Sequence, residues 1–130
     1  MKGAVFNPAS QSLLERAGVL GALRHVFVCI GPECCDPGDG EVLWEQIKAR
    51  VKKGGVSMMR TKAACLRVCQ GGPWLLVYPE GVWYGGVTPE RFERIYESHL
   101  VQGAVVSEWV VARNPLGCGG APDSPGGGGA

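Results

Sequence analysis

Apolar residues occur along the chain in patterns that predict both strands and helices. The short run of β-branched and aromatic residues His25–Ile30 predicts a buried strand, and Val56–Thr61 predicts a second strand. Between them, Gly40–Lys53 carries apolar residues three or four positions apart and ends with basic residues and Gly54, which predicts an amphipathic helix with a clear C-terminus. The first half of the chain therefore indicates a strand, a helix and a second strand.

The next pattern predicts a β-hairpin. Trp74–Tyr78 and Gly81–Tyr84 are both rich in aromatic and branched residues. They are joined by Pro79 and Glu80, and the proline and the following glycine occupy favoured positions of a type I turn. We therefore predict two antiparallel strands joined by a type I turn.

A second helix is predicted after the hairpin. Thr88 is a favourable N-cap, and proline and glutamate follow it in the first turn. Gly103 is suited to end this helix after about three turns. The valine-rich segment Ala104–Ala112 then predicts an edge strand or an ordered arm. The apolar stripe of the helix is formed by Phe92, Ile95, Tyr96 and Leu100.

The order of elements predicts an α/β fold of the thioredoxin-like class, with a central mixed sheet of four to five strands flanked by helices. Residues 25–112 would form this domain. Residues 1–24 would be an N-terminal extension with a short helix, and 113–130 a disordered tail rich in glycine and proline. Cys118 in that tail is predicted to be an unligated thiol.

Composition and charge exclude several classes of function. The 130 residues are 45% hydrophobic and carry a net charge of +1, without an apolar run near the roughly 20 residues of a membrane span. We therefore expect a protein that binds neither nucleic acid nor membrane. The six cysteines are too sparse for a disulfide scaffold, and the first residues lack the long apolar run of a signal peptide. A cytoplasmic location follows as an expectation, in which grouped cysteines serve as metal ligands or redox catalysts.

Four cysteines form two close pairs. Four residues separate Cys29 from Cys34, and three separate Cys65 from Cys69. Glycine and proline neighbours would let each loop bend around a centre, so the two pairs can converge on one metal site.

Three interpretations of these pairs compete. A structural zinc site in an interaction module would more often use CxxC pairs. A thiol-disulfide oxidoreductase of thioredoxin-like fold would use Cys34 with Cys35, or Cys65 with Cys69, but the CxxC motif usual after the first strand is absent because position 32 is Pro32. A 2Fe-2S cluster is the third interpretation, which the spacing alone supports only in part.

Three segments carry a family resemblance: HVFVCIGPECC, RTKAACLRVCQGGP and VYPEGVWYGGVTPERFERIYESHL. Over about residues 25 to 106 the chain resembles the thioredoxin-like 2Fe-2S ferredoxins of bacteria. The resemblance implies one 2Fe-2S cluster, single-electron transfer between donor and acceptor proteins without catalysis, and a homodimer. By position it implies four cluster ligands: Cys29, Cys34 or Cys35, Cys65 and Cys69.

Several residues near these motifs gain a predicted role. The Cx4C spacing and the count forward to the first helix favour Cys34 over Cys35 as the second ligand. Basic residues flank the second pair and are candidates for docking redox partners; these are Arg60, Lys62 and Arg67. Gly72-Pro73 is expected to form a tight turn of undetermined isomer, and His99 to interact with a helix C-terminus.

Overall fold

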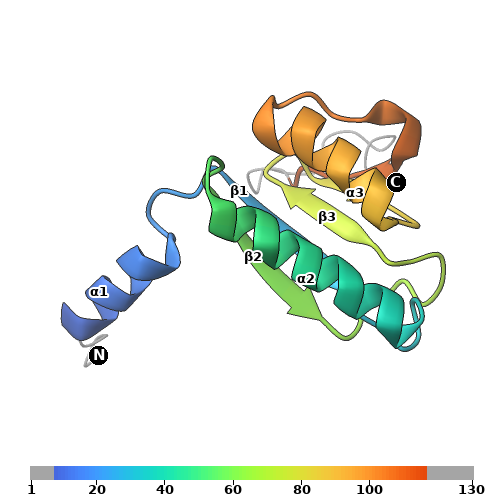
Figure 1. Cartoon of the computed structure of the whole chain (residues 1–130), viewed down its shortest axis with the longest axis horizontal. Coiled ribbons are helices and arrows are strands. Elements are labelled where there is room, and N and C mark those ends of the chain that lie inside the picture. Colours follow the sequence, from blue (N-terminus) through green and yellow to red (C-terminus); the bar gives the residue numbers. More distant parts are fainter. Residues whose placement is uncertain (1–7, 117–130) are drawn as a thin grey trace.

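Five strands form one mixed sheet in the order β2-β1-β3-β4-β5 in the computed structural model, which describes residues 8–116 (Figure 1). β1 runs parallel to β2 and antiparallel to β3, and the remaining pairs are antiparallel. The strands are β1 (Arg24–Cys29), β2 (Met58–Ala63), β3 (Leu75–Tyr78), β4 (Val82–Tyr84) and β5 (Val110–Arg113). The predicted sheet of four to five strands is thus confirmed with five.

The helices are unevenly distributed around the sheet. Figure 1 shows α2 and α3 in front of the strands, whereas α1 projects away from them. The helices are α1 (Pro8–Ala17), α2 (Pro37–Lys53), α3 (Pro89–Ile95), which continues as a π-helical turn (Tyr96–Val101), and a 3-10 turn (Ser107–Trp109). None of the helices in residues 8–116 is long and apolar enough to cross a bilayer.

Alternation of side chains along the strands gives the sheet two different faces. On β1, Val26 and Val28 are fully buried in the main core, which is completed by apolar residues of α2 and α3. Phe27 and Cys29 point to the other face and pack in a smaller cluster with Leu76 of β3. Cys29 therefore lies on the face that α2 and α3 leave uncovered.

Two boundaries and one turn differ from the sequence-based predictions. α2 begins at Pro37 rather than Gly40, because proline is well suited to the first helical turn. Only the end of Ala104–Ala112 is a strand, since a 3-10 turn precedes β5 at the sheet edge. The predicted type I turn is wrong: the Gly81 N–H donates to the Val77 carbonyl at 2.8 Å, which closes a wider turn, and the Tyr78–Pro79 bond is cis.

The predicted start and end of the second helix are confirmed. The Thr88 hydroxyl accepts a hydrogen bond from the Arg91 N–H at 3.2 Å, as an N-cap does. Gly103 has a positive φ of 78° and its N–H donates to the His99 carbonyl at the other end. Phe92 and Ile95 are fully buried, so this helix anchors the half of the core next to β3 and β4.

His99 lies in the last turn of its helix, as predicted, and its side chain is part of the core. Its side chain is fully buried, and Nδ1 lies 2.8 Å from the Tyr84 hydroxyl. That hydroxyl accepts from the Val106 N–H, so its own proton is available for Nδ1. Nε2 faces the Glu80 carboxylate at 3.5 Å, and Glu80 is held by Arg24. Burial lowers the pKa of His99, although the charge of Glu80 opposes this shift.

We expect the free energy of unfolding to decrease as the pH falls from 7.5 to 5.5. His99 is neutral in the folded state and binds a proton in the unfolded state near its ordinary pKa of about 6.5. Between pH 7.5 and 5.5 the unfolded state therefore binds more protons at His99 than the folded state does. Ordinary carboxylates are still ionised in this range. Urea unfolding at each pH measures the effect, and NMR of the ring nitrogens should show His99 uncharged at about pH 6. A flat or rising stability over this window would contradict the assignment.

Candidate metal centre

Three cysteine sulfurs meet at the end of β1. Cys29 is the last residue of the strand, and Cys34 and Cys35 lie in the loop before α2. Their Sγ atoms all lie within 4.8 Å of one another, with 3.7 Å between those of Cys34 and Cys35. Cys29 and Cys34 are 0% and 3% exposed, whereas Cys35 is half-buried. The structure thus brings together Cys29 and both candidates for the second ligand.

The second pair lies on the loop after β2. Cys65 and Cys69 are both exposed, and the Arg67 N–H donates to the Cys65 sulfur at 3.1 Å. Arg67 has a φ of 71°, a left-handed conformation that turns its N–H toward Cys65. The thiol of Cys65 raises the pKa of Cys69, and the charges of Glu33 and Cys34 raise it further. Among the described residues, the tight group of sulfurs holds Cys29, Cys34 and Cys35, and Cys65 and Cys69 lie outside it.

Hydrogen bonds join the two cysteine loops. The Gly72 N–H donates to the Cys34 carbonyl at 2.9 Å, and the Trp74 N–H donates to the Cys29 sulfur at 3.2 Å. A Cβ at Gly72 would lie 2.9 Å from the Cys34 carbonyl oxygen and 3.3 Å from the Cys29 sulfur, so glycine permits this close approach. The Gly72–Pro73 bond between these donors is cis.

Aromatic side chains cover the buried side of the centre. Trp74 is buried against Cys29 and Cys34, and its indole N–H donates to the Gln70 carbonyl at 3.0 Å. Trp83 packs edge-on against Trp74, with ring centroids 6.3 Å apart. The hairpin strands thus exclude water from one side of the cysteines while Cys65 and Cys69 remain open to solvent.

Burial makes the thiols of Cys29 and Cys35 hard to ionise. It raises the pKa of Cys29 to about 12 and that of Cys35 to about 11, with further contributions from Cys34. A catalytic dithiol needs a nucleophile with a lowered pKa. Neither Cys29 nor Cys35 therefore has the lowered pKa of such a nucleophile, whereas binding of a metal ion would displace the proton of either thiol.

The three predicted docking residues lie on two different elements. Arg60 and Lys62 lie on β2, on the face that also carries buried Met58, and both cations stack over the Trp44 ring of α2. Arg67 lies instead in the loop between the second pair of cysteines. Trp44 was not singled out from the sequence, because no spacing rule relates a residue of α2 to its partners on β2.

The backbone donors to sulfur were also missed. Trp74 and Arg67 donate through main-chain N–H groups, so their side-chain types carry no signal of this role. The glycine and proline around positions 71–73 were the available signal, because they predicted a loop that bends around the centre.

No family model matches the chain. Two curated relatives do: a 2Fe-2S ferredoxin of Aquifex aeolicus is 31% identical over 105 residues, which cover 72% of this chain and 94% of the relative. A 2Fe-2S ferredoxin of Clostridium pasteurianum is 36% identical over 94 residues, which cover 64% of this chain and 90% of the relative. Both relatives are matched over nearly their whole length.

Solved structures agree with these relatives. The thioredoxin-like [2Fe-2S] ferredoxin from Aquifex aeolicus superposes with a TM-score of 0.64 at 28% identity, and the match covers 80% of this chain and 99% of that one. Two further matches are single cysteine-to-serine variants of the same ferredoxin, which superpose with TM-scores of 0.63 and 0.64 at 29% identity. The order of elements, the two cysteine loops and these similarities together show that the chain belongs to the thioredoxin-like [2Fe-2S] ferredoxins.

Proposed function

We propose that this protein is a one-electron carrier that holds a single 2Fe-2S cluster on Cys29, Cys34, Cys65 and Cys69, with no substrate chemistry of its own. The observation that carries the proposal is the group of cysteine sulfurs at the end of β1, to which the loop that carries Cys65 and Cys69 is hydrogen-bonded. The Gly72 to Cys34 hydrogen bond fixes the two cysteine loops together. Family membership supports the cofactor, since the relatives are named as 2Fe-2S ferredoxins.

The residues present fit such a cluster. Its iron takes soft thiolate ligands, and each close pair offers two. Backbone N–H groups already donate to Cys29 and Cys65, one sulfur in each pair, and such bonds stabilise negative charge on sulfur. When bound, the cluster accepts one electron and releases it to another protein. Cys29, Cys34 and Trp74 would exclude water on one side, while the exposed Cys65 and Cys69 would form the side through which partners approach.

We propose three further properties. Residues 25–112 form the cluster-bearing unit, to which 1–24 and 113–130 are appended; Cys118 lies outside the described residues. The protein works in the cytoplasm, which the five free thiols of residues 8–116 support.

Two copies associate as a homodimer through the sheet face opposite α2, where Phe27 and Tyr78 are only half-buried. Sedimentation should give twice the chain mass, and Phe27→Glu should give a monomer; an unchanged mass would contradict this interface.

Metal analysis of protein prepared without oxygen tests the proposed cofactor. We expect a coloured protein with about two irons and two sulfides per chain and visible charge-transfer bands. Stoichiometric zinc in colourless protein would favour the structural zinc site. Metal-free protein whose thiols turn over disulfides would favour the oxidoreductase. Either result would overturn the proposal.

A further inference from the structure

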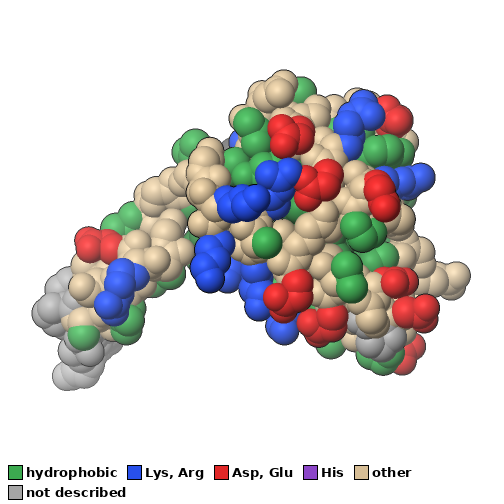
Figure 2. Space-filling model, in the orientation of Figure 1, with side chains coloured by type: hydrophobic (Ala, Val, Ile, Leu, Met, Phe, Trp, Pro, Cys, Tyr) green, Lys and Arg blue, Asp and Glu red, His purple; other side chains and the backbone are tan. Residues whose placement is uncertain are grey.

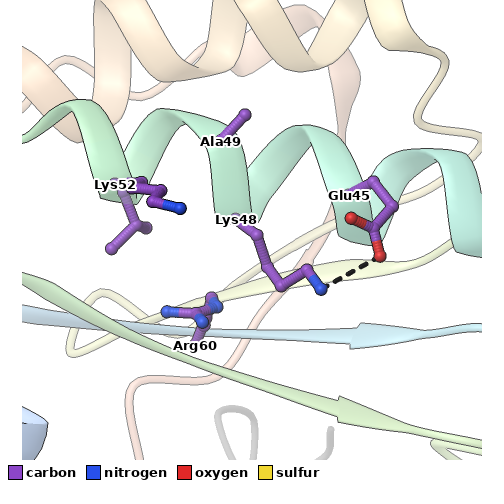
Figure 3. A pocket seen from close by; sticks show the side chains of 6 residues that line it. Glu45, Lys48, Ala49, Lys52 and Arg60 are labelled. Atoms are coloured by element: carbon purple, nitrogen blue, oxygen red, sulfur yellow. Dashed lines mark ion pairs between the residues drawn. The ribbon is translucent and has the colours of Figure 1, made fainter.

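A groove runs between the C-terminal half of α2 and the edge strand β2, with a volume of about 560 Å³ (Figure 3). Lys62 follows on the same face of β2, two residues beyond Arg60. In Figure 2, positively charged side chains gather along this part of the globule, on the side toward α1. The groove is lined by Glu45, Lys48, Ala49, Val51, Lys52 and Arg60. We use the name basic groove for the four cations in it and beside it, which are Lys48, Lys52, Arg60 and Lys62.

Most of these cations lack a carboxylate partner. Within residues 8–116, Lys48 pairs with Glu45 at 3.0 Å, but Lys52, Arg60 and Lys62 form no ion pair. Like charges held together without counterions repel one another, and an anionic surface placed over them would relieve that repulsion.

An indole ring holds two of the cations in place. The Arg60 guanidinium lies 5.5 Å from the Trp44 ring centroid, and the Lys62 ammonium 5.7 Å from it. Trp44 is itself buried, so the platform is fixed in the core. The dipole of α2 explains a lysine such as Lys52 near its C-terminus, but it does not explain two cations on a neighbouring strand. Cation–π contact therefore orders Arg60 and Lys62 before a partner binds.

Lys62 lies at the end of β2 next to Cys29, with its side chain on the α2 face of the sheet and Cys29 on the other face. Lys62 pairs in register with Val28, and the next residue, Ala63, pairs with Cys29. Adjacent strands lie about 4.8 Å apart. A protein seated on Lys62 would thus touch the same end of the sheet as the cysteines.

We infer that the basic groove docks an acidic surface patch of a protein electron-transfer partner. The inference rests on the proposed function and specifies the partner's chemistry: one electron leaves the reduced cluster for the partner's redox group, and no bond forms or breaks. A folded protein fits better than a nucleic acid, because an extended polyanion lying along α2 would meet two exposed acids, Glu45 in the groove and Glu41 one turn before it.

The test uses two haem proteins of opposite charge as probes, acidic cytochrome b5 and basic cytochrome c. Binding to the full-length protein is measured by calorimetry, and reduction of each ferric haem by the dithionite-reduced protein is measured by stopped flow. We expect Lys52→Glu/Arg60→Glu to weaken cytochrome b5 binding and slow its reduction about ten-fold or more at low salt. The difference should vanish near 1 M salt, where the Debye length is about 3 Å.

Arg91→Glu/Arg113→Glu is the matched control. It makes the same change in net charge, and Arg113 lies on β5, at the opposite edge of the sheet from β2. A control that weakens cytochrome b5 as much as the groove variant would show that net charge alone acts, and would overturn the inference. Equal binding of wild type and groove variant would also overturn it. Calorimetry measures binding to the basic groove even if the protein holds no cluster. Failure of the docking inference can therefore be distinguished from failure of the proposed function.

Discussion

Cys34→Ser is expected to abolish cluster binding, whereas Cys35→Ser should retain it. Cys34 is 3% exposed and its sulfur faces Cys29 from a loop fixed by the Gly72 N–H. Serine offers a harder and more basic oxygen than the thiolate that iron–sulfur clusters require. Iron content and the visible spectrum of the two variants, prepared side by side without oxygen, measure the difference.

The two variants are controls for each other, because they differ by one position in the same loop. Unfolding by urea shows whether each variant still folds, which separates loss of a ligand from loss of structure. Loss of the cluster in Cys35→Ser alone would assign the second ligand to Cys35 and contradict our choice. Full retention in both would contradict the requirement for either thiol.

Gly40→Ala is expected to destabilise the fold by about 3 kcal/mol, the upper end of the range for overpacking. A Cβ at Gly40 would lie 2.4 Å from the Ile30 Cα and 2.7 Å from its carbonyl oxygen. Both contacts are with backbone, so α2 must move away from the strand end that leads to the cysteine loop. We therefore expect cluster content to fall along with the free energy of unfolding measured in urea.

Gly38→Ala is the matched control for this prediction. Gly38 lies two residues earlier in α2, and a Cβ there meets nothing within 4 Å. Alanine is a better helix former than glycine, so this variant should equal or exceed the wild type in stability by up to about 1 kcal/mol. Equal effects of the two substitutions would show that helix propensity, rather than the contact with Ile30, governs this site.

The sequence was sufficient to predict the elements whose causes are local. The Thr88 N-cap, the helix end at Gly103 and the strands around β1 depend on neighbouring residues, and each was predicted to within a few positions. The spacing of each cysteine pair is likewise a property of one loop, and the assignment of the four cysteines as ligands stays a prediction. Fold class followed from the order of these elements.

Features that depend on distant contacts could not be predicted. His99 is not part of the apolar stripe that the sequence predicts for its helix. Only the contacts of its ring with Tyr84 and Glu80 show that it is buried. The predicted type I turn was wrong because the hydrogen bond that closes the hairpin joins Gly81 to Val77, and Val77 lies one residue before the predicted turn begins. The stacking of Arg60 on Trp44 joins a strand to a helix, and no spacing rule indicates it.

A redox titration that is monitored by electron paramagnetic resonance tests most directly the central claim, that the protein carries one electron on a 2Fe-2S cluster. The protein, purified without oxygen, is titrated with dithionite while the signal and the visible spectrum are recorded. We predict uptake of one electron per chain, with bleaching of the visible bands and a paramagnetic signal that integrates to about one spin per chain. Uptake of two electrons per chain with no paramagnetic signal, as a thiol-disulfide pair would give, would contradict the account.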